Sequence, residues 1–352
     1  MEEYIGCDAH KRYSVFRSWG KRGRLEQPVR VDHDTEVMRG YLGTLPPGSQ
    51  IAVETVGNWY WLISMMEEAG HRPKLAHAAK AKKMMGQINK GDSLDAGGLA
   101  GLLRAGTLPT VWIPPAELRD QRELPRGRMV LTGMRTKLKN RLHATLAKYN
   151  LQIEEASNIF VGKGRRMLLE RLRQLPPETR HSAELELGLL DEIELRIAEA
   201  EKRIRTVVKE TEEMQLLTTA PGIGPLLGIV VALEVGDVSR FPSPANLASY
   251  AGTVPRVISS GGKTYHGRVR PDVNRYLKWA LVEAANVVVL NQATWADRHT
   301  VQLYRRVRER KGHAKAVVAV ARHLAEATYW ILKKREPYRE PAAQKPVSST
   351  QG

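Results

Sequence analysis

The sequence has one cysteine, Cys7, in 352 residues. An internal disulfide is therefore excluded, and the composition suits the reducing cytoplasm. No stretch approaches the roughly 18 consecutive apolar residues that a membrane-spanning helix needs. Residues 1–5 include Glu2 and Glu3 and contain no apolar segment, so we expect no secretory signal there. These absences predict a cytoplasmic protein and no membrane partner.

Acidic residues are also in the minority, with 38 Asp and Glu against 55 Lys and Arg, and the formal charge is +17. An excess of this size attracts polyanions, with nucleic acid as the first candidate and an anionic membrane surface as the second. Hydrophobic residues make up 42% of the chain, which is enough to build cores. We therefore expect a folded protein with a basic surface and not a disordered chain. The length allows two or three domains.

The first hundred residues alternate between strand-like and helix-like patterns. Residues 4–8, 13–19 and 25–31 predict an antiparallel meander, in which residues 20–23 form a turn. Further strands are expected at 50–53 and 73–77, with helices at 34–45, 59–69 and 93–104 and a basic segment at 80–90. An initial meander followed by alternating helices and strands predicts a three-layer α/β domain.

The remainder of the sequence is mainly helical in pattern and shows no internal repeat. A basic helix is expected at 117–149 and a second long helix at 182–213, whose apolar residues recur at spacings of four or seven. This spacing indicates a helical hairpin or a coiled coil, and a plain bundle core is equally compatible with it. Composition shifts at Leu216. Later helices are expected at 241–251, 274–290 and 314–332, and a frayed tail from Glu336.

Four acids form the first candidate site: Asp8, Glu54, Asp92 and Asp95. Asp8 and Glu54 each lie at the end of an apolar strand, and Asp92 and Asp95 share one face of a helix start. Clustered carboxylates repel one another unless a cation lies among them, and Mg²⁺ or Mn²⁺ is the oxygen-seeking choice. Capping of a helix is the alternative role for Asp92 or Asp95. No Cys/His set has zinc spacing, and we interpret His10 as a flanking polar residue.

Residues 259–270 form the second candidate site. Ser259 and Ser260 precede a Gly-Gly turn, and cations flank them at Arg256, Lys263, Arg268 and Arg270. Such a turn can bind phosphate, and a serine there could attack a phosphodiester. A surface loop that only touches DNA phosphates is the open alternative. The first glycine of a Walker A loop is absent. Residues 221–224, Pro-Gly-Ile-Gly, form a turn that either binds a phosphate or simply joins two helices.

These segments resemble a known family, the DEDD-type transposases of the insertion-sequence 110 family. Residues 4–11 (Tyr-Ile-Gly-Cys-Asp-Ala-His-Lys) resemble its opening strand, with Cys7 in place of an aliphatic residue. Residues 53–57 (Val-Glu-Thr-Val-Gly) resemble its Glu-Ala-Thr-Gly motif, with Thr55-Val56 as a departure. Residues 90–96 (Lys-Gly-Asp-Ser-Leu-Asp-Ala) resemble Lys-Thr-Asp-x-x-Asp-Ala, with Gly91 replacing Thr. The resemblance continues through the basic helix at 135–143 and through 221–224, 241–252, Pro255, 260–263 and 267–268, and spans residues 4–338.

The resemblance implies a fold and a division into domains. Residues 1–112 would form an α/β domain with a RuvC-like RNase H fold, which carries the acids. Residues 113–213 would form a basic, coiled-coil-like helical segment, residues 214–338 a mainly α transposase domain, and residues 339–352 a disordered tail.

The resemblance also implies a chemistry. Asp8, Glu54, Asp92 and Asp95 would bind Mg²⁺ or Mn²⁺. The family's nucleophilic serine precedes a glycine five residues after the motif proline, which corresponds to Ser260, with Ser259 as the neighbouring alternative. A covalent phosphoserine–DNA bond would form during site-specific recombination of the element.

The implied partners are donor and target DNA and a guide (bridge) RNA that the element encodes. Subunits would assemble as a dimer or tetramer through the long helix at 182–213. Nucleic-acid contacts are expected from one set of cations: Lys11, Arg135, Lys137, Lys139, Arg141, Arg256, Lys263, Arg268 and Arg270. The alternatives are a RuvC-like metal-dependent nuclease or junction resolvase without a serine intermediate, and a non-enzymatic nucleic-acid-binding scaffold.

Overall fold

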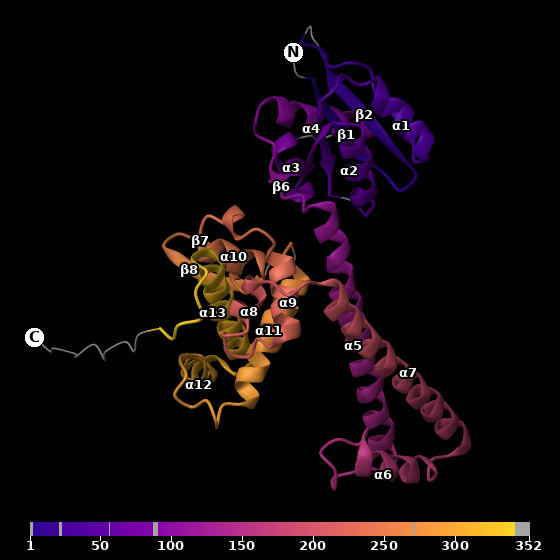
Figure 1. Cartoon of the computed structure of the whole chain (residues 1–352), viewed down its shortest axis with the longest axis vertical. Coiled ribbons are helices and arrows are strands. Elements are labelled where there is room, and N and C mark those ends of the chain that lie inside the picture. Colours follow the sequence, from indigo (N-terminus) through magenta and orange to yellow (C-terminus); the bar gives the residue numbers. More distant parts are fainter. Residues whose placement is uncertain (1–2, 21–22, 56, 87–90, 270–271, 342–352) are drawn as a thin grey trace, which may run out of the picture. The chain divides into compact units, whose positions relative to one another are not determined.

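The computed structural model describes residues 3–20, 23–55, 57–86, 91–269 and 272–341, with backbone only at 258, 260, 266 and 268. The chain divides into two compact units, Met1–Ala116 and Glu117–Gly352 (Figure 1). The first unit is a mixed α/β domain, and the second is mainly helical. The finer division of the second unit at residue 213 stays a prediction.

The first unit is built on a six-stranded sheet in the order β3-β2-β1-β4-β5-β6. Antiparallel pairing joins β1 to β2, β2 to β3 and β5 to β6, whereas β1, β4 and β5 run parallel. The predicted meander is confirmed, but its third strand begins at Val29 and not at Leu25, because Pro28 has no backbone N–H to donate to a neighbouring strand. The strands are β1 Tyr4–Ala9, β2 Tyr13–Trp19, β3 Val29–Asp32, β4 Gln50–Glu54, β5 Arg72–Ala76 and β6 Thr110–Val111.

Helices cover both faces of this sheet. On one face Ile5, Cys7 and Phe16 pack with α1 and α2, and on the other Ala52 and Ala76 pack with α3 and α4. This arrangement confirms the predicted three layers. The basic segment expected at 80–90 is helical over its described part, and residues 87–90 lie outside the described residues. The helices are α1 Thr35–Thr44, α2 Trp59–Glu68, α3 Ala78–Met85 and α4 Asp92–Arg104.

Gly6 sets how closely α4 approaches the sheet. A Cβ built on Gly6 would lie 1.9 Å from the backbone oxygen of Ala96 and 2.7 Å from the backbone nitrogen of Ala100. Only a residue without a side chain permits this contact between strand and helix backbones. The first turn of α4 therefore lies beside the end of β1.

Two long helices, α5 Ala116–Lys148 and α7 Pro177–Val207, run side by side in the second unit, with α6 Gly162–Leu172 between them in sequence (Figure 1). Ion pairs link Arg128 to Glu201, Arg135 to Glu194 and Arg141 to Glu186, so the two helices are antiparallel. The helix expected at 182–213 was wrong at both ends. Pro177 starts it, since proline suits the first helical turn, and Thr211 caps the separate α8 by accepting from the Met214 N–H.

The rest of the second unit is a helical body with one hairpin. Its core contains Val231, Leu281, Tyr304 and Leu324. The helices expected at 274–290 and 314–332 are confirmed. The helix expected at 241–251 begins at Pro244, whereas α12 and the hairpin strands were not predicted. The elements are α8 Glu212–Leu217, α9 Pro225–Val235, the 3-10 helix η1 Val238–Arg240, α10 Pro244–Tyr250, β7 Pro255–Ser260, β8 Lys263–Val269, α11 Arg275–Leu290, α12 His299–Lys311 and α13 His313–Lys334.

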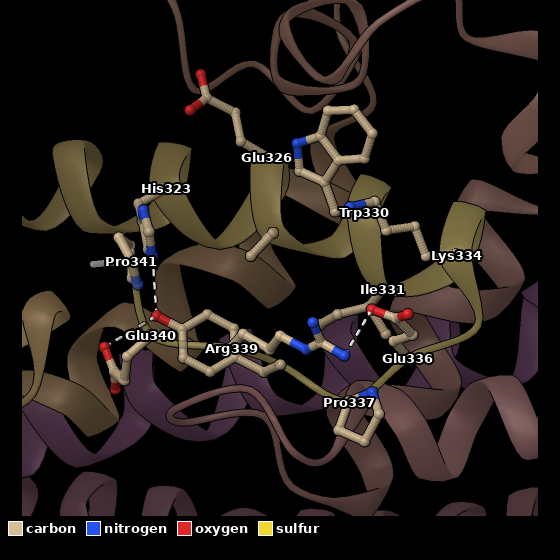
Figure 2. Close-up of a pocket in the computed structure, with 12 residues that line it drawn as sticks. His323, Glu326, Trp330, Ile331, Lys334, Glu336, Pro337, Arg339, Glu340 and Pro341 are labelled. Atoms are coloured by element: carbon tan, nitrogen blue, oxygen red, sulfur yellow. Dashed lines mark hydrogen bonds and ion pairs between the residues drawn. The ribbon is translucent and has the colours of Figure 1, made fainter.

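After α13 the described chain folds back along that helix, so the expectation of fraying from Glu336 was wrong for residues 336–341. Tyr338 Oη lies 3.0 Å from His323 Nε2, and the Tyr338 N–H donates to the Thr219 hydroxyl at 2.7 Å. Figure 2 shows this segment beside a cavity of about 410 Å³ that Trp330 also lines. Burial raises the pKa of Tyr338 and lowers that of His323. Residues 342–352 lie outside the described residues.

Among the helices that the structure describes, none combines the length and the apolar character that crossing a bilayer requires.

The Gly6 contact predicts opposite effects for two alanine substitutions. Gly6→Ala forces α4 away from β1 and lowers the free energy of unfolding of the first unit by at least about 2 kcal/mol. Gly101→Ala, on the same helix, raises it by about 0.5–1 kcal/mol, because the nearest atom to its Cβ is 3.9 Å away and alanine is the better helix former. Hydrogen exchange of the β1 amides measures both changes. Equal protection in the two variants would contradict the contact.

Candidate functional site

Two of the four predicted acids lie at the ends of neighbouring parallel strands. Asp8 follows Cys7 in β1, and Glu54 follows Val53 in β4, and Cys7 and Val53 are direct partners in the sheet. Parallel strands bring equivalent ends to one edge, so the register places Asp8 beside Glu54. Asp8 is buried, with 7% of its surface exposed, whereas Glu54 is half-buried. A carboxyl buried to this degree is costly without a partner.

The other two acids, Asp92 and Asp95, lie in the first turn of α4. Their helix rests on β1 through the Gly6 contact, and this brings Asp92 over the end of the strand. The Tyr13 hydroxyl donates to Asp92 Oδ2 at 3.0 Å. Neither acid serves as the cap of α4, since the residue at that position is Gly91. The capping alternative for Asp92 and Asp95 is therefore wrong.

His10 belongs to the same cluster, although the sequence suggested only a flanking polar residue. Its Nε2 atom lies 3.1 Å from Asp8 Oδ2 and 3.2 Å from Asp92 Oδ2. A hydrogen bond fixes the backbone of the loop that carries His10: the Asn58 side-chain amide donates to the His10 carbonyl at 3.0 Å. The spacing from Asp8 to His10 was the only sequence signal: residues two apart in an extended chain share a face.

The acids perturb one another electrostatically. Burial raises the pKa of Asp8 to about 6; His10 opposes this shift. The negative charges of Asp95, Asp92 and Glu54 reinforce it. Burial also raises the pKa of Glu54, and Asp95 adds to that shift. The charges of the three other acids therefore act on Asp8 at a single edge of the sheet.

This cluster fits a divalent cation. One ligand atom each from Asp8, His10 and Asp92 lies within 4.8 Å of the others, which is a suitable spacing for a shared ion. The carboxylate oxygens of Asp8 and Asp92 are hard donors of the kind that Mg²⁺ and Mn²⁺ prefer, and imidazole is a softer donor. Glu54 and Asp95 lie near enough to act electrostatically but are not members of this closest group.

The predicted serines lie on a tight hairpin. Gly261 and Gly262 connect β7 to β8 with φ angles of 57° and 74°, the left-handed values of a two-residue hairpin turn. Ser260 and Lys263 are partners across this turn. The Ser259 hydroxyl lies 2.8 Å from the Thr264 hydroxyl, so the two share a hydrogen bond. For Ser260 the structure describes only the backbone.

A buried carboxylate, which the sequence interpretation missed, holds the base of this hairpin. Glu234 in α9 is fully buried and accepts two hydrogen bonds from Arg126, at 2.8 and 3.0 Å. Asn274 donates to Glu234 at 2.8 Å and to the Tyr250 hydroxyl at 2.9 Å, and its oxygen caps α11. The Asn274 N–H also donates to the Tyr250 carbonyl. This bond joins the segment before the hairpin to the segment after it. The available signal was an acid within an otherwise apolar helix.

The predicted nucleic-acid-binding cations have different surroundings. Arg135 and Lys139 both pair with Glu194, and Arg141 pairs with Glu186, so α7 neutralises three of the four on α5. Arg141 is exposed despite its ion pair, and Lys11, Lys137, Arg256 and Lys263 are exposed as well. Only the backbone of Arg268 is described, and Arg270 lies outside the described residues.

Both halves of the chain match family models. Residues 5–151 match a model described as a transposase, and residues 214–301 match one described as the transposase IS116/IS110/IS902 family. The four acids and His10 fall in the first matched segment, and the serine hairpin falls in the second.

Individual relatives cover most of the chain. A protein of Pseudomonas aeruginosa with the name "Probable family 20 transposase" is 28% identical over 95% of this chain and 98% of its own length. The transposase for insertion sequence element IS1111A of Coxiella burnetii is 27% identical over 71% of this chain and 69% of its own. The transposase for element IS1328 of Yersinia enterocolitica is 26% identical over 70% and 72%.

The raised pKa of Asp8 predicts how stability depends on pH without a divalent cation. The folded state keeps the Asp8 proton up to about pH 6, whereas an unfolded chain loses it near pH 4. The contribution of Asp8 to the free energy of unfolding therefore decreases as the pH rises from about 4 to about 6, and it stays low at higher pH. Asp8→Asn removes this cost. We expect the variant to be more stable than the parent by roughly 2 kcal/mol at pH 7.5 in EDTA, a gain that disappears by pH 4.

Urea denaturation at several pH values measures this difference. Asp32→Asn is the matched control, because the exposed Asp32 pairs only with Arg30 among the described residues. Excess Mn²⁺ should make the parent more stable than Asp8→Asn, because the cation binds and stabilises the parent alone. A variant that is less stable than the parent in EDTA at every pH would contradict the argument.

Proposed function

Because this chain belongs to the IS116/IS110/IS902 family of transposases, we propose that it cleaves and rejoins DNA through a cation-binding acidic cluster and a covalent serine intermediate. One observation carries the proposal: Asp8, Asp92 and His10 converge within 4.8 Å at the end of the central strand. A structural role alone does not call for such convergence, since it makes the ionisation of Asp8 costly.

In this proposal the acidic cluster positions the phosphodiester. Asp8 and Asp92 hold Mg²⁺ or Mn²⁺, with Glu54 and Asp95 as the further carboxylates. Such a cation would offset the negative charge that builds on the phosphoryl oxygens. His10 lies at hydrogen-bonding distance from both Asp8 and Asp92 and can orient their carboxylates or join them as a ligand. The sheet order, an antiparallel meander followed by parallel strands, supports a RuvC-like RNase H fold.

Ser260 is the proposed nucleophile. Its Oγ loses its proton and forms a bond to phosphorus, the bond from phosphorus to one deoxyribose oxygen breaks, and that oxygen takes up a proton and leaves as a hydroxyl, so the step has no net proton change. Attack by a DNA hydroxyl on the phosphoserine reverses these steps and rejoins the strand. The hydrogen bond of Ser259 to Thr264 supports Ser260 as the reacting residue, because the Ser259 hydroxyl is already engaged. Exposed Arg256 and Lys263 can bind the flanking phosphates.

The proposal includes an element-encoded guide RNA and assembly into a dimer or tetramer, in which the acids and the serine act on one phosphodiester. The +17 charge suits a protein that holds nucleic-acid backbones while base pairing supplies specificity. Leu185, Leu189 and Leu195 on α7 are 63%, 53% and 66% exposed, and this apolar surface supports α7 as a subunit contact.

Substitution of the serines tests the chemistry. We expect Ser260→Ala to abolish covalent protein–DNA product, a loss of at least about 10³-fold, because no nucleophile remains. Ser259→Ala should keep at least a third of the parental amount. Labelled donor DNA is incubated with protein and Mg²⁺, and the protein-linked label is measured on a denaturing gel.

The alternatives give other patterns in the same assay. A metal-dependent nuclease or junction resolvase would cleave DNA equally well with Ser260→Ala and would never become linked to it. A nucleic-acid-binding scaffold would be unaffected by Asp8→Asn, whereas the proposal expects that variant to lose both cleavage and linkage.

A further inference from the structure

Helix α12 and the first turn of α13 carry a dense set of cations that the proposed function does not use. Residues 305–315 include six Lys and Arg and a single acid, Glu309. All six cations are exposed: Arg305, Arg306, Arg308, Arg310, Lys311 and Lys315. We refer to these six residues as the α12 cations.

The α12 cations differ from those of α5 in their partners. On α5, Arg135, Lys139 and Arg141 have carboxylate partners on α7. In the part of the chain that the structure describes, none of the α12 cations forms an ion pair; nearby pairs involve Arg298 and Arg322 instead. Arg305 donates to the neutral Gln292 carbonyl at 2.8 Å. Their positive charge is therefore uncompensated within the second unit.

Stabilisation of the helix itself explains only part of this set. Cations in a last helical turn interact favourably with the carbonyl end of the helix, by about 0.3–1 kcal/mol each. Arg308, Arg310 and Lys311 lie in the last turn of α12 and gain this stabilisation. Arg306 precedes that turn and Lys315 lies in the first turn of α13, where the helix end repels a cation.

The α12 cations project from a rigid support. Tyr304, which is 2% exposed, packs into the core of the second unit, and its hydroxyl lies 2.9 Å from His313 Nδ1 at the start of α13. Gly312 between the helices has a φ of 79°, which permits the sharp turn. The two helices therefore hold the backbone that carries the six side chains in a fixed place on the second unit.

We propose that the α12 cations bind the phosphate backbones of duplex DNA without regard to sequence, as a contact separate from the serine hairpin. A 13-residue helix is about 20 Å long, and duplex DNA carries one negative charge per ~1.7 Å of axis, so about twelve phosphates pass along it. The exposed positions of α12 carry no Phe, Tyr or Trp, because its one such residue, Tyr304, is buried. The helix therefore lacks the large aromatic rings on which single-stranded bases stack, which favours a duplex over a single strand.

The inference rests on the proposed function for its partner, DNA, but not on the serine chemistry. The test variant is the triple substitution Arg306→Gln, Arg310→Gln and Lys315→Gln. The control is the triple substitution Arg165→Gln, Arg180→Gln and Arg196→Gln. It removes an equal number of positive charges from α6 and α7, where each of these cations pairs with an acid. All six positions lie on helix surfaces, and melting curves confirm that both variants are folded.

Fluorescence anisotropy of a 30-base-pair duplex of arbitrary sequence is measured at several salt concentrations in EDTA. We expect the α12 variant to bind about tenfold more weakly at 0.1 M salt. Its slope of log affinity against log salt should be shallower by about 2.7, which is ~0.9 for each lost phosphate contact. The control should keep the parental slope.

Three results would overturn the proposal: unchanged binding in the α12 variant, equal weakening in both variants, or a loss confined to duplex RNA of the same length. Failure of the serine chemistry appears in a different assay, as missing covalent product, and leaves this anisotropy unchanged. Conversely, the α12 variant should still form covalent product at saturating DNA.

Discussion

The candidate site depends on one close contact between backbones, that of Gly6 in β1 with Ala96 and Ala100 in α4. Because Gly6 has no side chain, α4 lies directly on the central strand, and its first turn reaches the end where Asp8 is buried. Burial, reinforced by the charges of the neighbouring acids, raises the pKa of Asp8, so its ionised form is costly without a cation and the cluster is suited to one. A bulkier residue at position 6 would separate Asp92 from Asp8 without altering either acid.

The second unit solves a comparable positioning problem with a buried carboxylate. Glu234 is fully buried, yet Arg126 and Asn274 satisfy both of its oxygens, and Asn274 also caps α11 and bonds to Tyr250. This network ties the long helix α5 to the segment that carries the serine hairpin. Buried ionic networks add little net stability but fix geometry when every member is satisfied. The proposed attack of the Ser260 hydroxyl on a phosphodiester would benefit from such a fixed base.

Charge is distributed unevenly over the second unit. On α5 four cations, Arg128, Arg135, Lys139 and Arg141, pair with acids of α7 and hold the antiparallel helices together. On α12 comparable side chains face solvent. The net charge of the chain therefore says little about where a polyanion binds, since paired cations contribute less to the external field than unpaired ones.

The sequence by itself determined the class of the first unit, its layers and the identity of the four acids, because strand ends, helix starts and alternation are local patterns. It also determined the Gly-Gly turn beside the serines, since two adjacent left-handed residues require glycine. Only the tertiary structure decided that His10 joins the acids, that Glu234 anchors the hairpin and that acids of α7 pair with four of the α5 cations. These outcomes depend on pairs of side chains far apart in the sequence or on how a loop turns, and local periodicity carries no information about such contacts.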